Sequence, residues 1–222
     1  MDRRAVIISF GTNDIEARKT MENLENRLMS FSDIPVSTAH LLHNSGNTLD
    51  EIITEHGNEE LLLMPLLIQK GSEYERICSY GFQTGEPLLG NEEDAITIAE
   101  IMNTSLPPVP DTSYILIAHG TEKKEIKEFG LLQRHLRRDM LLTSLKGKDN
   151  YMTAPVPDTK HIIIIPFLFA AGHHVKKDMK ERVVPFYERK DRIVTLREEG
   201  LLSISDGFSE LVCSHFRNLL TR

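Results

Sequence analysis

The chain has 222 residues, of which 40% are hydrophobic, enough to bury the core of one large domain or of two modest ones. Its net charge of −7 at pH 7 excludes the broad basic surface of a general nucleic-acid-binding protein. The apolar run at residues 5–10 is too short for a signal peptide or a membrane span, so we expect no membrane partner either. The two cysteines, Cys78 and Cys213, fall in expected helices and suit buried, reduced thiols in a cytoplasmic protein.

In chain order, short and nearly continuous apolar runs alternate with stretches of helical period. The predicted strands are residues 5–10, 61–68, 114–118, 161–169 and 192–196. The predicted helices are 14–30, one from a Thr48–Glu51 capping box to Gly57, one capped by Ser72 with Glu75, one beginning at Asn91, and 208–220. Strands without polar alternation are typical of parallel sheets covered on both faces, so we predict an α/β fold with helix-flanked, mainly parallel sheets.

A proline-rich segment at residues 103–113 carries no core pattern and is the natural linker between two halves. We therefore predict an N-terminal α/β subdomain at 1–106 and a C-terminal α/β subdomain at 107–222. The last helix is free to pack on the first subdomain.

The two halves have similar strand endings, which indicates duplicated units. The first strand of each half runs into a glycine turn, Phe10-Gly11-Thr12 in one and His119-Gly120-Thr121 in the other. A later strand in each half contains a proline, Pro65 or Pro166, and leads to another glycine. Ligands of such sheets bind beyond the carboxyl ends of the strands, so we expect an active-site cleft between the two similar subdomains.

Histidines stand at two of these strand ends. His119 closes one strand, and His173 and His174 follow another after Gly172. Neutral imidazoles in a cleft can bind a borderline divalent ion or accept a proton near neutral pH, although a strand-end histidine can also simply be well packed. The neighbouring Lys176 and Lys177 either meet an anionic ligand or belong to a solvated helix face.

The other histidines are expected in solvent or core packing, and a nearby group of arginines on the surface. These histidines are His40, His43, His56, His135, His161 and His215, and the arginines are Arg134, Arg137 and Arg138.

Several enzyme classes are disfavoured by the same stretches. A histidine phosphatase needs arginine directly before its His-Gly, where this chain has Ala118. The turn after the first strand holds only one glycine, unlike a dinucleotide-binding loop. The sequence also lacks a P-loop, a Gly-x-Ser-x-Gly elbow and zinc-type cysteine pairs.

In their order along the chain, the motifs resemble the anaerobic cobalt chelatase family, the sirohydrochlorin cobaltochelatases of the class II chelatase superfamily. The matching stretches are "VIISFGTN", "MPLLIQKGSEYERI", "GEPLL", "IAHGTE" and "IPFLFAAGHHVKKDM". The resemblance spans nearly the whole chain and places the family's two metal-site histidines at His119 and His174, with Asp178 and Met179 closing the second motif.

Three departures from the family pattern bear on the site. The family's metal-site glutamate has no counterpart, since residues 151–160 read "YMTAPVPDTK". A helix before the strand at 161–169 is also missing. Finally, Leu67 stands where the family usually has histidine, and His173 replaces an aspartate.

The resemblance implies a lyase-type metal chelatase that inserts cobalt(II) into sirohydrochlorin or a precorrin-type tetrapyrrole in cobalamin biosynthesis. It implies His119 and His174 as catalytic residues and metal ligands. Because the family's glutamate is missing, we expect His173 or water to complete the coordination, with Glu122 as the other candidate. No organic cofactor is implied, because the divalent metal is a substrate. The competing hypothesis is a non-catalytic relative that binds a tetrapyrrole or metal, and the sequence leaves homo-oligomer formation open.

Overall fold

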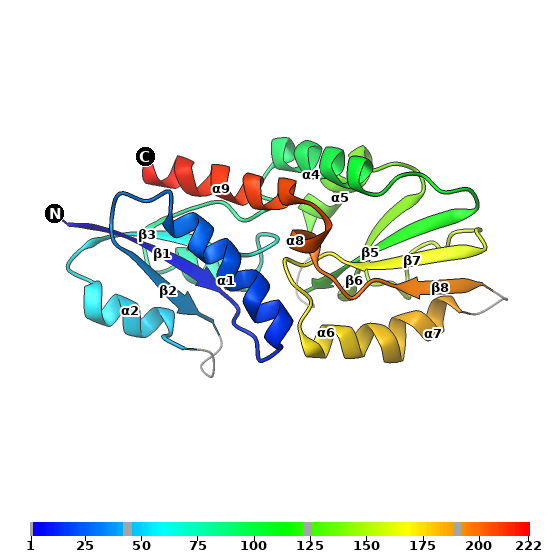
Figure 1. The fold of residues 1–222 in the computed structure, drawn as a ribbon, viewed down its shortest axis with the longest axis horizontal. Coiled ribbons are helices and arrows are strands. Elements are labelled where there is room, and N and C mark those ends of the chain that lie inside the picture. Colours follow the sequence, from blue (N-terminus) through cyan, green and yellow to red (C-terminus); the bar gives the residue numbers. More distant parts are fainter. Residues whose placement is uncertain (1, 42–45, 122–125, 189–191) are drawn as a thin grey trace. The chain divides into compact units, whose positions relative to one another are not determined.

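The chain folds into two compact units, each built around one parallel sheet (Figure 1). The computed structural model describes residues 2–41, 46–121, 126–188 and 192–222, and the His174 side chain lies outside the described part. Contacts group Met1–Gly90 with Ser209–Arg222 in one unit and Asn91–Phe208 in the other. The predicted subdomain boundary between residues 106 and 107 concerns which parts of the chain fold independently, and it stays a prediction. The active-site cleft expected between the subdomains also stays a prediction.

The first unit alternates strands and helices. Its elements are β1 (Arg3–Ser9), α1 (Ile15–Met29), β2 (Val36–His40), α2 (Leu49–His56), β3 (Glu60–Pro65), α3 (Ser72–Cys78), β4 (Gln83–Thr84) and most of α9 (Asp206–Leu220). All strand pairs are parallel, in the order β2-β1-β3-β4. The predicted α/β architecture with parallel sheets is therefore confirmed for this half.

Helices cover both faces of this sheet, because successive strand connections run in opposite directions across it. The chain moves from β1 to β2 on one side and then from β2 back past β1 to β3, so right-handed crossovers place α1 and α2 on opposite faces. On the α2 face, Val6, Ile8 and Leu63 pack against Leu49 and Ile52 of that helix. Burial on both faces explains why the strand sequences show no polar alternation.

Side-chain caps fix the start of several helices, as the sequence predicts in part. Thr48 and Glu51 form the expected capping box, with Thr48 Oγ1 accepting from the Glu51 N–H at 3.2 Å. Asn91 Oδ1 likewise accepts from the Asp94 N–H at 3.0 Å. The Ser72 prediction is wrong: α3 is preceded by Gly71 and has no side-chain cap, because Ser72 is already its first helical residue.

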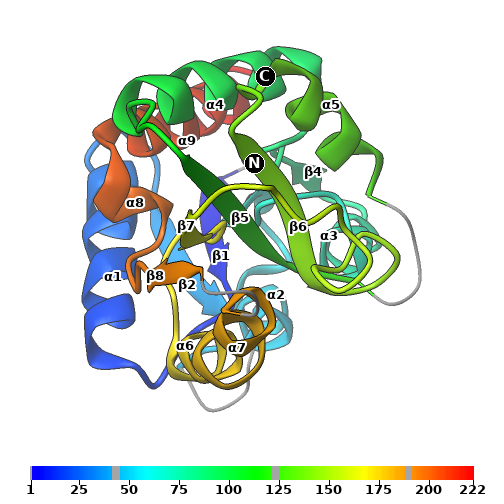
Figure 2. The ribbon, with the colours of Figure 1, turned by 90° about the vertical axis from the view of Figure 1, so that its right-hand side faces the viewer.

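The second unit repeats the topology of the first. Its elements are α4 (Glu92–Ser105), β5 (Thr112–Gly120), α5 (Lys127–His135), β6 (Met140–Lys146), β7 (His161–Pro166), α6 (His173–Asp178), a π-helical turn (Met179–Val183), α7 (Val184–Tyr187), β8 (Ile193–Leu196) and α8 (Leu201–Ile204). The order β6-β5-β7-β8 is again all parallel. Helices α4 and α5 cover one face of this sheet and α6 with α7 the other (Figures 1 and 2).

The duplication extends to the register of the strands. Ile8 pairs with Pro65 in the first sheet, and Ile117 pairs with Pro166 in the second. The residue after each proline donates its N–H to the carbonyl of the proline's register partner. Leu66 donates to Ile8 O and Phe167 donates to Ile117 O, both at 2.7 Å. Gly11 and Gly120 also share a left-handed backbone, with φ of 74° and 75°. The duplicated strand endings seen in the sequence therefore reflect duplicated backbone geometry.

The two units differ in the connection that precedes the proline-containing strand. In the first unit α2 fills it, whereas residues 151–160 of the second form turns and irregular chain without a helix, as the sequence predicts. Tyr151 of this connection is buried in the core of the second unit. Its side chain is 3% exposed and packs in the cluster that contains Ile115 and Ile117, and its ring lies edge to face with that of Phe186, with the ring centroids 5.3 Å apart. Tyr151 thus packs on the same face of the sheet as Met179, Val183 and Tyr187 of the α6–α7 stretch, in a connection that has no helix of its own.

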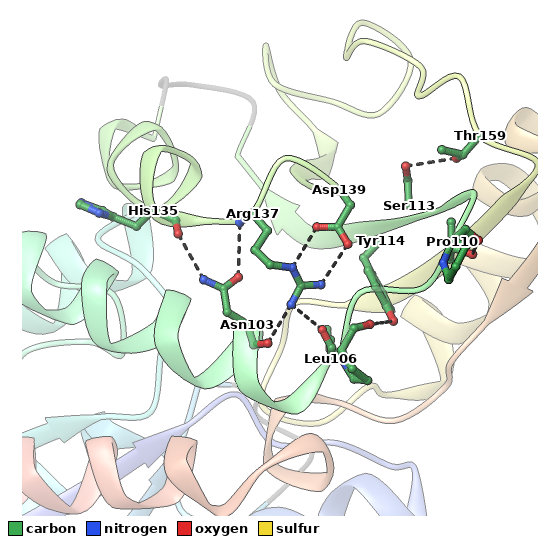
Figure 3. Close-up of polar contacts among 11 residues, drawn as sticks. Asn103, Leu106, Pro110, Ser113, Tyr114, His135, Arg137, Asp139 and Thr159 are labelled. Carbon is green, nitrogen blue, oxygen red and sulfur yellow. Dashed lines mark hydrogen bonds and ion pairs between the residues drawn. The ribbon is translucent and has the colours of Figure 1, made fainter.

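Arg137 is not the surface residue expected from the sequence, because it ties the proline-rich segment to the second sheet (Figure 3). Its guanidinium pairs with both Asp139 carboxylate oxygens at 3.0 Å and donates to the carbonyls of Asn103 and Leu106 at 2.7 Å. The Tyr114 hydroxyl donates to the Pro107 carbonyl, also at 2.7 Å. Residues 103–113 are therefore fixed by contacts inside the second unit.

Smaller corrections concern the cysteines and one histidine. Cys213 is buried as expected, but Cys78 is exposed, because it lies on the outer side of α3. His40 lies in a strand and not in a loop, as the last residue of β2. His43 lies outside the described residues. Within the described part of the chain, none of the helices has the length and apolar character needed to cross a bilayer.

Candidate functional site

His119 lies at the carboxyl end of β5, where the buried strand reaches the surface. The seven residues before it, Thr112–Ala118, are all buried, and His119 itself is exposed. Gly120 next to it has a left-handed backbone, and a Cβ there would lie 2.2 Å from the Lys146 carbonyl oxygen. Glycine is therefore required for the strand to end here and hold His119 at its tip.

The His119 ring is oriented by its own backbone. Its Nδ1 atom lies 3.2 Å from the Gly120 carbonyl oxygen. Because a carbonyl can only accept, Nδ1 carries the proton in this contact, which leaves the Nε2 lone pair of the neutral ring available. A histidine whose second nitrogen donates to a carbonyl is typical of metal ligands.

His173 and His174 begin the helix that follows β7. His173 is the first residue of α6 and is exposed, and Gly172 precedes the helix with an extended backbone. The backbone of His174 lies in the first turn of α6, but its side chain lies outside the described part. A helix begins directly after Gly172, so the two histidines do not alternate between faces as they would in a strand.

Neighbouring strands bring these two segments to the same edge of the sheet. β5 and β7 are paired, with Phe167 N–H donating to Ile117 O at 2.7 Å, so His119 and α6 both follow the carboxyl ends of adjacent strands. Among the described side chains, no three His, Cys, Asp or Glu residues group closely enough to hold a metal ion. The convergence of His119 with His174 stays a prediction, as does a role for His173, and Glu122 lies outside the described residues.

The helix carrying these histidines is interrupted by a π turn. Val184 N–H donates to Met179 O, five residues back, within a helical stretch that runs on to Tyr187. Pro185 follows and has no N–H to continue the α-helical ladder. Met179 and Val183 are fully buried against the sheet, so the turn keeps the helix packed despite the proline.

Cationic side chains lie on the same edge of the second sheet. Lys146, the last residue of β6, is exposed and stands opposite Gly120 in the strand register. Lys177 is exposed and lies 3.9 Å from Glu181, one turn further along the helix. The edge therefore contains positive charge near His119.

The first sheet carries a polar network at its own carboxyl edge that sequence reasoning missed. Ser9 ends β1, His40 ends β2, and the two are register partners. Ser9 Oγ lies 3.0 Å from His40 Nδ1 and donates to Glu25 Oε1 of α1 at 3.1 Å. Ser9 is 2% exposed and Glu25 is 7% exposed. A buried carboxyl group is therefore hydrogen-bonded to a buried hydroxyl, which in turn contacts an imidazole.

Burial changes the proton affinity of both ends of this network. Burial raises the pKa of Glu25, partly opposed by the hydrogen bond from Ser9, and the negative charge of Glu22 raises the pKa further. Burial also lowers the pKa of His40 below its ordinary value. Both shifts favour neutral side chains in this location.

Two four-stranded parallel sheets flanked by helices, with ligand-type residues at their carboxyl edges, define the chelatase-like α/β class. SirB from Bacillus subtilis with Fe3+ shares this fold at a TM-score of 0.67 and 16% identity, covering 99% of this chain and 96% of that one. The SirB sirohydrochlorin chelatase from Bacillus subtilis subspecies spizizenii in complex with cobalt gives 0.64 and 15%, covering 100% and 96%. DR2241 from Deinococcus radiodurans, a multi-domain protein similar to chelatases, gives 0.59 and 15%, covering 96% and 54%.

The family follows from a match that covers nearly the whole sequence. Residues 3–218 match the family model described as cobalt chelatase (CbiK). The chain belongs to the cobalt chelatase family, which confirms the resemblance found in the sequence motifs.

Proposed function

We propose that this protein is a sirohydrochlorin cobaltochelatase of the cytoplasm, which inserts cobalt(II) into sirohydrochlorin or a precorrin-type tetrapyrrole during anaerobic cobalamin biosynthesis. Membership in the cobalt chelatase family supports the enzyme class. The observation that carries the proposal is the exposed His119 at the end of β5, beside the strand that leads into the His-His start of α6. The metal is a substrate of the reaction, and no organic cofactor is needed.

Imidazole is suited to hold cobalt on its way into the macrocycle. His119 offers Nε2 because its Nδ1 proton is engaged by the Gly120 carbonyl. We propose His119 and His174 as metal ligands, with His173 or water completing the coordination. A site rich in nitrogen ligands favours cobalt or nickel over magnesium, which prefers oxygen.

The reaction also requires bases. Two pyrrole N–H protons must leave the macrocycle before its four nitrogens can hold a divalent ion. The ordinary pKa of histidine, near 6.5, leaves a ring mostly neutral in the cytoplasm and able to accept such a proton. His119 and His174 are proposed to act both as ligands and as bases.

The substrate must also be held by its charge. Tetrapyrroles of this class carry several carboxylates, which bind ammonium groups through charge-assisted hydrogen bonds. Lys146 lies at the edge that presents His119, and Lys176 and Lys177 follow the histidine pair on α6. We propose these lysines as the source of charge complementarity on this edge.

A second function, metal or tetrapyrrole carriage without insertion, is favoured by one observation. Residues 151–160 contain no glutamate, and Tyr151 is turned into the core. If insertion depends on a carboxylate ligand from this segment, the protein binds its ligands and stops there.

An insertion assay with variants separates these functions. Metal-free sirohydrochlorin is mixed with cobalt(II), and the change in its absorbance is followed with and without protein. We expect wild type to accelerate cobalt insertion, and His119→Ala and His174→Ala each to slow it about a hundredfold, in the range measured for lost acid–base or ligand groups. His161→Ala is the matched control, since His161 is an exposed histidine at the opposite, amino end of the same sheet.

Two results would count against the chelatase. Binding of cobalt or sirohydrochlorin without faster insertion indicates the carrier. Equal rates in His119→Ala, His174→Ala and His161→Ala remove the proposed site while leaving the family assignment intact. Thermal unfolding of each variant is measured in parallel, and His119→Ala is expected to keep wild-type stability because the exposed His119 side chain contributes little to packing.

A further inference from the structure

The connections that follow β3 and β7 are held in the same way in both units. Each runs for six residues, 66–71 or 167–172, from the proline that ends a strand to the first residue of a helix. Two consecutive backbone N–H groups from the segment after the next strand donate to two consecutive carbonyls of the connection. These hydrogen bonds are Leu88 to Leu67 (2.9 Å) and Leu89 to Ile68 (2.8 Å) in the first unit, and Leu201 to Leu168 (2.7 Å) and Leu202 to Phe169 (3.2 Å) in the second. We call each pair of hydrogen bonds a clamp.

The two clamps differ at the residue that precedes the donor pair. Pro87 stands there in the first unit and Gly200 in the second. Gly200 is buried, and its backbone is ordinary, with φ of −83°. A Cβ added to it would lie 2.4 Å from Phe169 O, 2.6 Å from Ala170 Cα and 2.7 Å from Leu168 O. Glycine is therefore required here by space and not by conformation, because two stretches of main chain approach too closely for a side chain.

The clamped connection of the second unit leads directly into the histidine pair of α6. His173 is the first residue of this helix, and three residues, 170–172, separate it from the clamped carbonyls. The residue that precedes the helix is Gly172, which has no side chain to cap it. The main chain of residues 168 and 169 therefore determines where α6 begins, and Gly200 allows the clamp to hold it there.

His119 belongs to the same face of the sheet as α6. Side chains alternate along β5, so His119 shares the face of Ile115 and Ile117. Both isoleucines are buried in a cluster against which Val175 of α6 packs. A shift in the start of α6 therefore changes how far the imidazoles of its first turn lie from the His119 ring.

We propose that Gly200 is a positioning residue for cobalt binding: it lets the clamp fix the start of α6 and so places His173 and His174 relative to His119. This inference rests on the proposed function, in which these histidines are candidate ligands of the metal. Gly200 has no side chain to bind metal or tetrapyrrole, and it acts only through the histidines.

Metal binding is sensitive to such a shift because ligand bonds tolerate little error. Imidazole nitrogens bind zinc-like ions at about 2.0–2.1 Å, and a working site keeps these distances within about 0.2 Å. The carbon added in Gly200→Ala would lie 2.4–2.7 Å from three main-chain atoms, whereas ordinary contacts begin near 3.4 Å. The backbone that leads into α6 must therefore move by more than the metal bonds tolerate.

Cobalt(II) binding to the full chain tests this role without a tetrapyrrole. The visible absorption of the bound ion reports both its affinity and its coordination geometry. Gly200→Ala is expected to raise the dissociation constant for cobalt about tenfold and to change the absorption bands, as when groups that orient metal ligands are lost. Gly57→Ala is the matched control, since a Cβ there would also meet main chain, 2.6 Å from Ile53 O, but in the first unit. Its cobalt affinity and spectrum are expected to match those of wild type.

A double-mutant cycle separates positioning from a general loss of structure. If Gly200 acts through the histidine pair, adding Gly200→Ala to His174→Ala should weaken cobalt binding by less than about twofold more. An equal, about tenfold loss in both backgrounds would show that the substitution damages the fold, and would overturn the proposal.

Hydrogen exchange in wild type covers the case in which Gly200→Ala does not fold. If the clamp sets the metal site, cobalt binding slows amide exchange at Leu201 and Leu202 more than at Leu88 and Leu89, the clamp of the first unit. Mass spectrometry of peptides that cover the two pairs measures the difference. Equal slowing at both pairs, or none at either, would contradict the positioning role.

The positioning role and the proposed function can fail separately. If Gly200→Ala has wild-type cobalt affinity and spectrum, and both proteins insert cobalt into metal-free sirohydrochlorin equally fast, the role of Gly200 is wrong and the function stands. If Gly200→Ala weakens cobalt binding but wild type inserts no cobalt, the chelatase fails and the positioning of the histidine pair stands. Absence of cobalt binding in wild type removes both.

Discussion

At the scale of single residues, Gly120 is held in a conformation that a side chain cannot enter. Its φ is 75°, and an added Cβ would lie 2.2 Å from Lys146 O and 2.7 Å from Ser144 Cβ. We expect Gly120→Ala to lower the free energy of unfolding by about 2 kcal/mol or more. Urea denaturation followed by circular dichroism measures it.

Gly130 is the matched control for that substitution. It lies inside α5, and nothing comes within 4 Å of a Cβ added there. Gly130→Ala is therefore expected to raise the free energy of unfolding by about 0.5–1 kcal/mol, since alanine favours a helix interior. Equal effects at the two glycines would contradict the assigned backbone of the His119 turn.

Tyr187 buries a hydroxyl at a cost. The side chain is fully buried, its OH has no hydrogen-bond partner among the described residues, and burial raises its pKa to about 12. An unsatisfied buried hydroxyl costs roughly 1–3 kcal/mol, so Tyr187→Phe is expected to raise the melting temperature by a few degrees. A lower melting temperature would show that the hydroxyl has a partner, such as a buried water.

Glu25 makes stability depend on pH in a definite direction. Because its pKa is raised in the folded state, the folded protein binds more protons than the unfolded chain above pH 4.5, so this residue lowers stability as the pH rises through its folded pKa. The stabilising effect of Glu25→Gln is therefore expected to be larger at pH 8 than at pH 5. Denaturation at both pH values checks this, and a gain confined to pH 5 would reverse the sign.

Some residues of the candidate site could be identified from the sequence, and others could not. His119 was identifiable because an apolar run ends at it and glycine follows. Ser9, Glu25 and His40 could not be grouped, because they are far apart in sequence and meet only through the pairing of β1 with β2 and the packing of α1. His40 in particular is the last residue of a short, weakly apolar strand that resembles a loop in sequence.

At the scale of elements, the repeated strands were the most predictable part of the chain. Their nearly continuous apolar runs indicate buried parallel strands. Pro65 and Pro166 stand at equivalent register positions in the two sheets. β2, β4 and β6 were not predicted. β4 has only two residues, which pair with β3 without an apolar run of their own.

The segment between β6 and β7 shows how an element can be lost without losing the fold. The sequence correctly predicts that no helix fits in residues 151–160, but it does not reveal that Tyr151 takes the place of one in the core. This packing depends on Phe186 from α7, which is distant in sequence. The same exchange places Tyr151 in the segment where the family resemblance expects a metal-site glutamate.

At the scale of the whole molecule, the duplicated topology assigns different chemistry to corresponding positions of the two units. The end of β5 presents His119, whereas Phe10 follows the end of β1 at the corresponding position. The register pair Ser9 and His40 of the first sheet corresponds to Ala118 and Ser144 in the second.

Multiple-turnover cobalt insertion tests the chelatase proposal most directly. Metal-free sirohydrochlorin and cobalt(II) are supplied in large excess over the protein at neutral pH, and product is followed by absorbance against the uncatalysed reaction. The chelatase proposal predicts many molecules of cobalt sirohydrochlorin per protein chain, at a rate proportional to protein concentration. Product limited to one molecule per chain, or a rate equal to that without protein, would contradict it.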